Sequence, residues 1–461
     1  MGGLSKKSSL LQSLATPEND LKIDAGTLFF DDKLYRQPQR IQQSLITASA
    51  LVQAYNHMEY DAVAIGRQDL AAGPQALQTL AHEASFPFLS ANIVDMEGAL
   101  LFKEIVHLKR AGMRIALIGL TGQAKLPDSG VDALKILAWQ DVLPDLLKRA
   151  AGKSDLVILL SNLSAADNKE ISRQHSDVHL IFQSGVSKQN LRPQQINNTL
   201  ISQSGHDGKY QGQLTVNWTS SKKWQQGEHP ILALRKEYDR LGWLINRVQK
   251  KGGPKEVYKD NETRQKDFAK KLKRYQELEV ELKKITAEEK KNSVPKASHS
   301  NHFHPLPPSV PDDAVMIKLL QESRKKANQV RRQTAETKKL DQYLGSQQCR
   351  SCHEQLYTAW AKTPHASSYQ TLQERDQNNN LTCVYCHVTG LDETTAYLAT
   401  SLPTRLLEVG CEVCHGPGQM HAENPKQNSP SKIPNPRLCT NCHAPDRDDN
   451  FDFQVKKGKI H

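Results

Sequence analysis

The sequence predicts a multidomain protein with an N-terminal α/β sandwich, a charged helical hairpin, and a C-terminal domain that is mostly helical and irregular. Three observations lead to this prediction. Apolar runs alternate with helical patterns over residues 1–225, two charged helical patterns follow in 226–291, and all eight cysteines lie within 343–461. Residues 292–342 have the composition of a Pro/Ser-rich connector followed by a basic helix. With 461 residues, 38% of them hydrophobic, the chain is long enough for more than one core.

The first region, residues 1–225, contains seven apolar runs of strand length, separated by amphipathic helical patterns. They are "LKIDAGTLFF", "YDAVAIG", "FPFLSANIV", "MRIALIGLT", "SDLVILLSN", "VHLIFQSG" and "GQLTVNW". Runs of this length between helices are typical of an α/β sandwich or sheet. We therefore expect this region to form an α/β domain.

The second region, residues 226–291, has apolar residues at helical spacing on both sides of the break "KKGGPKE". Leu234, Tyr238, Leu241, Ile245 and Val248 precede the break, and Phe268, Leu272, Tyr275, Leu278, Leu282 and Ile285 follow it. This spacing predicts two helices packed on each other, with an oligomerising coiled coil as the alternative. After it, "NSVPKASHSNHFHPLPPSVP" is expected to be a connector and "AVMIKLLQESRKKANQVRRQT" a basic helix.

The cysteines occur in four copies of one motif, "CRSCH", "CVYCH", "CEVCH" and "CTNCH". A Cys-x-x-Cys pair alone is compatible with a redox dithiol, half of a zinc site, or attachment of a c-type haem. Because only 17 of 461 residues are histidine, finding one after all four pairs by chance has a probability on the order of one in a million. Zinc has no use for a histidine fixed beside each pair, whereas a porphyrin binds both thiols covalently and its iron binds the histidine.

The sequence therefore predicts four covalently bound c-type haems. The expected attachment residues are Cys349, Cys352, Cys383, Cys386, Cys411, Cys414, Cys439 and Cys442, and the expected proximal iron ligands are His353, His387, His415 and His443. The motifs begin 34, 28 and 28 residues apart, so the haems must be neighbours. This density favours electron transfer; the alternative is a haem oxidoreductase acting on a small nitrogen or sulfur compound.

Further histidines of this region are expected to supply the second axial ligands. The expected distal ligands are His365, His421 and His461, so one of the four irons has no second axial ligand from this region. Either the upstream segment supplies the missing ligand, through His302, His304 or His299, or one iron keeps an open position.

The turn "GPG" separates His415 from His421. Glycine permits backbone angles closed to other residues, and proline fixes one angle, so this turn can redirect the chain. We therefore expect His421 to bind a different haem from His415.

Three segments carry a family resemblance over about residues 343–461: "SQQCRSCHEQLYTAWAKTPHA", "CVYCHVTG" and "EVGCEVCHGPG". In motif order and in the Gly-Pro-Gly turn, this part resembles the tetrahaem cytochromes c that accept electrons from hydroxylamine oxidoreductase, and their wider relatives. The resemblance implies two histidines on most irons and allows one five-coordinate haem. It implies redox proteins as partners, although nothing in the sequence identifies a hydroxylamine-oxidising complex.

The N-terminal region resembles a second family through "GGLSKKSSLL", "YNHMEYDAVAIGRQDL", "FPFLSANIVD", "RIALIGLTG" and "SDLVILLSNLS". These segments are similar, in the same order, to the 5′-nucleotidase branch of the calcineurin-like metallophosphoesterases. That family holds two metals, which activate water for attack on a phosphate ester. The strand that carries its first Asp-x-His motif has no counterpart, so we expect the true N-terminus to lie upstream.

The remaining metal-ligand motifs of that family are replaced in this chain. Their positions are Gly26 and Thr27, Gly66 to Asp69, Ser161 to Ser164, and Ser184 to Ser187. A fold tolerates such losses, whereas a two-metal site does not. We therefore expect a catalytically inactive domain that serves as a scaffold or docking module, with Asp24 and Asp69 as ordinary polar residues at loop ends.

The net charge of +11 does not indicate nucleic-acid binding, because of how it is distributed. Residues 343–461 carry 11 Lys/Arg and 12 Asp/Glu, so the excess lies in the remaining 342 residues, mainly in the charged helices. Ionised propionates of four haems would add a charge of about −8 to the C-terminal domain. The helices are expected to be solvated, and the expected partners are redox proteins.

The expected location follows from the haem chemistry. The first residues, "MGGLSKKSSLLQSLA", have no sustained apolar core of a secretory signal, and no run of about 18 apolar residues is present. Haem attachment of this kind takes place outside the bacterial cytoplasm, as the resemblance implies. We expect a periplasmic or cell-surface bacterial protein, either on its own or within a membrane- or surface-associated complex.

Overall fold

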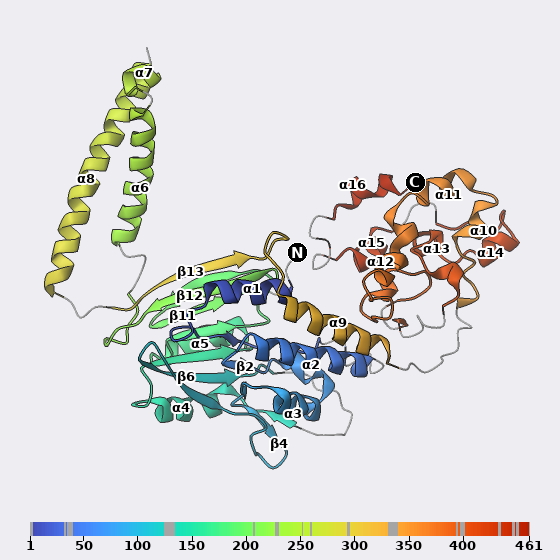
Figure 1. The fold of residues 1–461 in the computed structure, drawn as a ribbon, viewed down its shortest axis with the longest axis horizontal. Helices are drawn as coiled ribbons and strands as arrows, with labels where there is room; N and C mark the ends of the chain where they lie inside the picture. The colour runs from blue at the N-terminus through green and yellow to red at the C-terminus, as the bar shows by residue number, and fades with distance from the viewer. Residues whose placement is uncertain are drawn as a thin grey trace.

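The computed structural model describes residues 3–31, 34, 40–123, 134–205, 208–225, 230–250, 252–258, 261–292, 296–330, 340–392, 395–396, 402–431, 435–444, 448 and 451–460. Figure 1 shows an α/β domain with a helical hairpin projecting from one side and a smaller, mostly helical domain on the other. The predicted fold class is confirmed in all three parts.

Two β-sheets form the centre of the α/β domain. The larger has the order β10 (Leu191–Ile196), β11 (Thr199–Gln203), β9 (Leu180–Gln183), β8 (Leu156–Ser161), β6 (Met113–Leu120) and β5 (Ile105–Arg110). Its four inner strands are parallel, and both edge strands are antiparallel to their neighbours. The smaller sheet is parallel throughout, in the order β1 (Ile23–Asp24), β2 (Ala62–Ala64) and β3 (Phe88–Leu89).

Helices cover the outer faces of the two sheets, which makes a four-layered sandwich. Side chains of β2 and β3, including Ala62 and Leu89, pack between the sheets against Leu117 and Leu160. On the outside, α2 (Ile41–His57) and α3 (Pro74–Glu83) cover the small sheet, and α4 (Trp139–Ala150) and α5 (Ala165–Gln174) cover the large one. All six residues of β8 are buried, as expected for a parallel strand covered on both faces.

All seven predicted apolar runs contain a strand. Besides the strands already named, they include β4 (Ile93–Asp95), which pairs with β7 (Leu134–Ile136), and β12 (Tyr210–Asn217). The alternation of apolar runs and helical patterns therefore predicts these strands of the α/β domain correctly.

The helical hairpin is formed by α6 (Pro230–Gln249) and α8 (Glu262–Asn292), with the short α7 (Pro254–Tyr258) at its tip. Leu241, Ile245, Val248, Phe268 and Leu278 are buried between the helices. The rings of Tyr238 and Tyr275 stack with centres 4.3 Å apart. The two helices thus pack on each other, as the spacing predicts.

The segment expected to be a connector is part of the α/β domain, and this corrects the sequence prediction. Ser298–Pro305 forms β13, which pairs with β12 in an antiparallel ladder running from Tyr210↔Pro305 to Asn217↔Ser298. The sequence does not reveal this strand, because polar and histidine residues rather than an apolar alternation occupy it.

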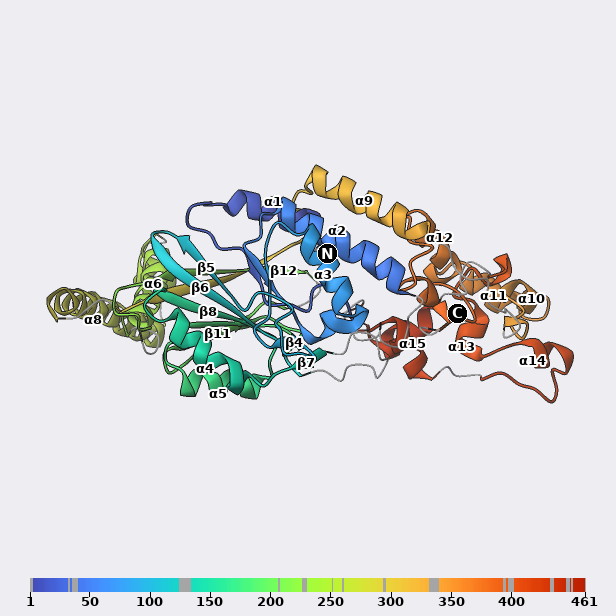
Figure 2. The ribbon, with the colours of Figure 1, turned by 90° about the horizontal axis from the view of Figure 1, so that it is seen from below.

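The basic helix is confirmed as α9 (Ala314–Asn328), and it lies along α2 (Figure 2). Its N-cap, Asp313, accepts hydrogen bonds from the backbone N–H groups of Val315 (2.9 Å) and Met316 (3.2 Å). The same carboxylate also accepts a hydrogen bond from Ser8 Oγ of α1 (Leu4–Leu14) at 2.6 Å and forms a hydrogen bond with His57 Nε2 of α2 at 2.8 Å. One carboxylate therefore joins three helices.

The C-terminal domain consists of short helices joined by turns. They are α10 (Ser346–Arg350), α11 (Glu354–Trp360), α12 (Ser368–Gln373), α13 (Cys411–His415), α14 (Gln419–Glu423), α15 (Pro436–Cys442) and α16 (Phe453–Lys456). Its small apolar core contains Leu372, Leu381, Val384 and Val388. In the described part of the whole chain, no helix is long and apolar enough to cross a membrane.

Candidate functional site

The first pair of histidines in the C-terminal domain joins two distant motifs. His353 follows α10, and His421 lies on α14, after the third motif. The centres of their imidazole rings are 6.2 Å apart, and the ring planes are 20° from parallel. Gly416, at φ +88°, ends α13 and turns the chain before α14 begins, which directs His421 away from His415.

A second pair has similar spacing. His365 lies in the 3₁₀ turn Pro364–Ser367, and His443 directly follows α15. Their ring centres are 6.1 Å apart, with planes at 69°. The indole of Trp360 anchors the segment before His365 by donating to the Val409 carbonyl at 3.1 Å.

Both spacings fit two imidazoles on opposite faces of one iron. A metal–imidazole bond is about 2.0–2.1 Å long, and the ring centre lies about 1.1 Å beyond the nitrogen. Two such rings have centres about 6.3 Å apart, close to the 6.2 and 6.1 Å observed. The space between the rings of each pair therefore fits a haem iron.

Hydrogen bonds to Nδ1 prepare four of these histidines for metal binding. The acceptors are the carbonyl oxygens of Ser368 for His387 (2.8 Å), Ser431 for His415 (2.5 Å) and Asn428 for His421 (2.7 Å), and the carboxylate of Asp448 for His443 (2.9 Å). An acceptor at Nδ1 keeps the proton there and leaves the Nε2 lone pair for a metal. These partners are residues that sequence reasoning did not find.

A buried carboxylate, Glu412, holds the first and third motifs together. It lies between the two cysteines of the third motif and is 4% exposed. It accepts hydrogen bonds from the backbone N–H groups of Leu344 (2.9 Å), Gly345 (2.7 Å) and Gly418 (2.7 Å). A Cβ at Gly345 would lie 2.7 Å from the Arg405 carbonyl oxygen, so this approach requires glycine.

The cysteines of different motifs lie close together. Cys411 lies beside Cys349, each being the first cysteine of its motif, and this neighbour together with burial raises the pKa of the Cys349 thiol. Cys414 of the third motif is near Cys439 of the fourth, and burial together with this neighbour raises the pKa of its thiol to about 11. The first, third and fourth attachment sites are therefore neighbours.

The other predicted axial ligands are not part of these two histidine pairs. No second imidazole lies at pairing distance from His387 within the residues that the structure describes. His461 lies outside the described residues. His302 and His304 lie on β13 of the α/β domain, where they pair with β12 residues, so the idea that this segment reaches across to an iron is not supported.

The positions that correspond to metal ligands of phosphoesterases form a closed polar network. Asn162 Nδ2 donates to Ser184 Oγ (3.1 Å) and to Thr27 Oγ1 (3.3 Å), and its Oδ1 accepts from Arg67 N (2.7 Å). Thr27 Oγ1 in turn donates to Ser184 Oγ at 3.1 Å. Each of these side chains is neutral, and each bonds to another member of the network.

Asp69, expected to be an ordinary polar residue, is instead a fully buried structural acceptor. Its carboxylate accepts from the backbone N–H groups of Thr27 (2.8 Å), Phe29 (2.7 Å) and Gly66 (2.9 Å). Burial raises the pKa of Asp69 to about 6, although these N–H groups favour the ionised form. Across the described ranges, no group of three or more His, Cys, Asp or Glu side chains is arranged to hold a metal ion.

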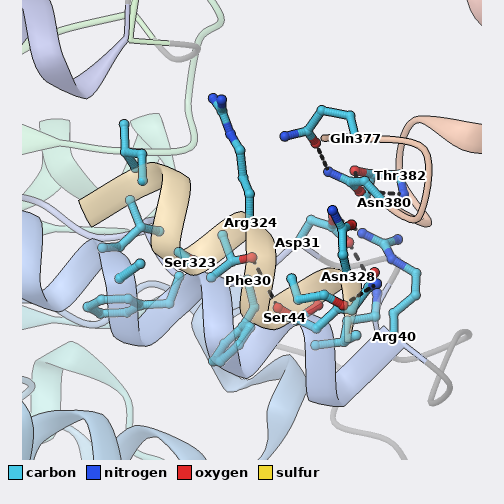
Figure 3. Close-up of a pocket in the computed structure, with 18 of the residues that line it drawn as sticks. Phe30, Asp31, Arg40, Ser44, Ser323, Arg324, Asn328, Gln377, Asn380 and Thr382 are labelled. Atoms are coloured by element: carbon cyan, nitrogen blue, oxygen red, sulfur yellow. Dashed lines mark hydrogen bonds and ion pairs between the residues drawn. The ribbon is translucent and has the colours of Figure 1, made fainter. Parts of the chain in front are cut away.

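A crevice of about 380 Å³ lies where the α/β domain meets the C-terminal domain (Figure 3). Helices α2 and α9 form one wall, and residues 376–382 contribute to the other. Beside it, Gln43 of α2 donates to the carbonyl oxygens of Ala327 (3.0 Å) and Asn379 (2.8 Å), and accepts from Leu381 N (3.3 Å). Leu381 lies two residues before Cys383, so this contact holds the chain that leads into the second motif.

Comparison with known proteins identifies relatives of the C-terminal part. Residues 348–416 match the family "Cytochrome c554 and c-prime". The chain is 32% identical over 92 residues to cytochrome c-554 of Nitrosomonas europaea, a match that covers 17% of this chain and 39% of that protein.

The α/β part has different relatives. Over 188 residues it is 29% identical to 5′-nucleotidases of Vibrio parahaemolyticus and Vibrio vulnificus, a match that covers 33% of this chain and 34% of each of those proteins. Similar solved structures include a 5′-nucleotidase precursor from Thermus thermophilus, with TM-score 0.46, 15% identity, and coverage of 75% of this chain and 55% of that one. Another is calcineurin-like phosphoesterase YfkN from Bacillus subtilis, with TM-score 0.43, 14% identity, and coverage of 71% and 89%.

The chain thus spans about a third to two fifths of the length of its curated relatives. The sequence matches confirm both resemblances. This chain joins a part that is similar to 5′-nucleotidases to a part that matches the cytochrome c554 family over residues 348–416.

Proposed function

We propose that this protein is an electron carrier whose C-terminal domain binds four c-type haems, one at each Cys-x-x-Cys-His motif. The observation that carries the proposal is the spacing of the pairs His353–His421 and His365–His443, at 6.2 and 6.1 Å. Two imidazoles fill both axial positions of an iron, which suits electron transfer because no position is left for a substrate. Bound haem would supply one-electron redox chemistry.

The residues of the chain would hold neighbouring haems in fixed contact. His421 joins the segment after the third motif to the first motif, and His365 joins the segment after the first motif to the fourth. Glu412 fastens the first motif to the third. Such cross-links keep attachment sites rigid, and rigid neighbouring centres need little rearrangement when an electron moves.

A reduced-minus-oxidised spectrum, combined with electron paramagnetic resonance, tests this role. We expect a low-spin c-type spectrum with bis-histidine signals from at least two haems. A purely high-spin spectrum would mean that neither pair binds iron, and the electron-carrier proposal would then fail.

The arrangement around His387 favours a second candidate function. Among the described residues its ring has no imidazole partner, while Ser368 holds its Nδ1. An iron bound only by His387 would keep an open position, where a small nitrogen or sulfur compound could react. Cyanide or nitric oxide binding to one haem of the four would distinguish this oxidoreductase from a simple carrier.

We further propose that the phosphoesterase-like domain is catalytically inactive and acts as a scaffold. Its network of Thr27, Asn162 and Ser184 is neutral, and the carboxylate of Asp69 is occupied by backbone N–H groups. Two-metal hydrolysis requires several carboxylate and imidazole ligands. Turnover of a phosphodiester or a nucleotide in the presence of Mn²⁺ would overturn this part of the proposal and leave the haem assignment unaffected.

The proposed location is the periplasm or the cell surface of a bacterium, with redox proteins as partners. The covalent attachment of haem to Cys-x-x-Cys-His motifs supports it, because attachment takes place outside the cytoplasm in the family that this chain resembles. Fractionation of cells that express the gene from its own promoter tests this location. Recovery of the haem-loaded protein in the cytoplasmic fraction would contradict it.

A further inference from the structure

Two histidines of β13 lie side by side, although the proposed electron transfer makes no use of them. His302 and His304 are two residues apart, so both side chains leave the strand on the same face. Their ring centres are 4.3 Å apart with planes at 61°. His302 is exposed and His304 is half-buried.

A third group faces the same place from the neighbouring strand. Gln213 of β12 lies opposite His302 in the ladder. Its Oε1 accepts a hydrogen bond from His304 Nε2 at 2.8 Å, so this nitrogen carries a proton that a metal ion would displace on binding. Two imidazoles and an amide oxygen therefore converge within one patch, formed by residues 213, 302 and 304.

The spacing within this patch matches neighbouring positions on one metal ion. Two ring centres about 3.2 Å from an ion lie about 4.5 Å apart at a bond angle of 90° and about 5.2 Å apart at the tetrahedral angle. The observed 4.3 Å between the ring centres agrees with the 90° arrangement rather than with the tetrahedral one.

From this geometry we infer a divalent transition-metal site at His302, His304 and Gln213. Right angles between nitrogen and oxygen ligands are typical of Cu²⁺ and Ni²⁺, whereas Zn²⁺ prefers a tetrahedron. The site takes Cu²⁺ or Ni²⁺ in preference to Zn²⁺, and water completes the coordination. With two imidazoles it binds an exchangeable ion rather than a permanently held one.

The same strand contains a matched control. His299 lies three residues before His302 on β13, so its side chain leaves the strand on the opposite face. There its ring lies edge-on to Trp224, with the ring centres 5.6 Å apart. Replacing it removes an imidazole from the same strand while leaving the patch intact.

The test is isothermal titration calorimetry, in which the tag-free, haem-loaded protein is titrated with NiCl₂ at pH 7.5. Loss of even an outer-shell partner typically weakens metal affinity by 10–100-fold, so we expect His302→Ala and His304→Ala to weaken one Ni²⁺ site by at least about tenfold. His299→Ala should retain that site. His302→Asn and His304→Asn, which keep a polar side chain, guard against a folding defect, and the urea unfolding curve followed by circular dichroism reports on the folding of the α/β domain.

Three results would overturn the inference. They are an unchanged Ni²⁺ isotherm in the double variant His302→Ala/His304→Ala, an equal loss of affinity in His299→Ala, and tighter binding of Zn²⁺ than of Ni²⁺ at the same site. None of these results bears on the haem domain, so the inference stands or falls separately from electron transfer.

Discussion

The imidazole rings of His353 and His421 have their centres 6.2 Å apart and their planes 20° from parallel, although 68 positions separate the two residues in the sequence. His421 lies six residues after His415 but is paired with the histidine of a different motif. In the proposed function, the same short segment would attach one haem through Cys411 and Cys414 and would supply the second axial ligand of another through His421.

Replacing His421 by alanine should convert one haem from low-spin to high-spin. The iron held by His353 would lose its sixth ligand, while all eight attachment cysteines stay in place. Electron paramagnetic resonance measures the change. Met420→Ala is the control, because the Met420 side chain is 66% exposed next to His421. Unchanged low-spin signals in His421→Ala would mean that this ring does not bind iron.

Replacing Asp448 by asparagine should raise the midpoint potential of one haem. The Asp448 carboxylate lies 2.9 Å from His443 Nδ1, and a negatively charged partner makes the imidazole a stronger donor, which stabilises oxidised iron. Spectroelectrochemical titration measures the potential. Glu354→Gln removes one negative charge from an exposed site of the same domain and should have a smaller effect. Equal shifts in the two variants would contradict the proposed role of Asp448.

Replacing Gln43 by alanine should loosen the contact between the two domains. Its amide bonds to Ala327, Asn379 and Leu381, and a lost buried hydrogen bond costs about 1–3 kcal/mol. Hydrogen exchange should accelerate at the Leu381 amide, which donates to Gln43 Oε1. Gln42→Ala, at an exposed position of the same helix, should leave exchange unchanged. If both variants exchange at the same rate, Gln43 does not fasten the domains.

His179 should make the stability of the α/β domain depend on pH. Burial, with Lys222 adding to it, lowers the pKa of His179 to about 4, and its Nδ1 accepts a hydrogen bond from Val157 N at 2.9 Å. Between pH 4 and 6.5 the unfolded chain therefore binds a proton that the folded one does not. The free energy of unfolding should fall by about 2–3 kcal/mol as the pH decreases through this range.

His179→Asn isolates this effect, because the amide oxygen of asparagine can replace Nδ1 as the acceptor but does not titrate. Circular dichroism in urea, measured at several pH values, gives the slope for each protein. Asp69 contributes a slope of opposite sign over pH 4–6, since its raised pKa makes the folded state bind the extra proton. The comparison therefore rests on the difference between wild type and variant, and parallel slopes would refute the assignment to His179.

The fold could be predicted wherever apolar residues repeat with a clear period. The run "SDLVILLSN" predicts β8, and Leu241 and Ile245 predict the seam of the hairpin. Strands β5 and β13 were not found, because exposed polar residues such as His107 and Ser300 interrupt the apolar pattern in both. A ladder with few apolar residues is held by backbone pairing, which leaves little trace in a sequence.

The candidate site could be predicted only in part. The motif identifies His353 and His443, but their pairing with His421 and His365 depends on how the chain folds back. Glu412 was not found, because a single acidic residue between two cysteines has no distinguishing pattern until the fold brings Gly345 beside it. Outer partners of metal ligands are generally of this kind, since they are adjacent in space rather than in sequence.

The most direct test of four covalent haems is the mass of the denatured protein after expression with haem-attachment machinery. We predict the mass of the polypeptide plus four haem groups, because each of the four motifs supplies two thiols and a histidine. A polypeptide mass without haem, or cysteines that hold zinc instead, would contradict the account.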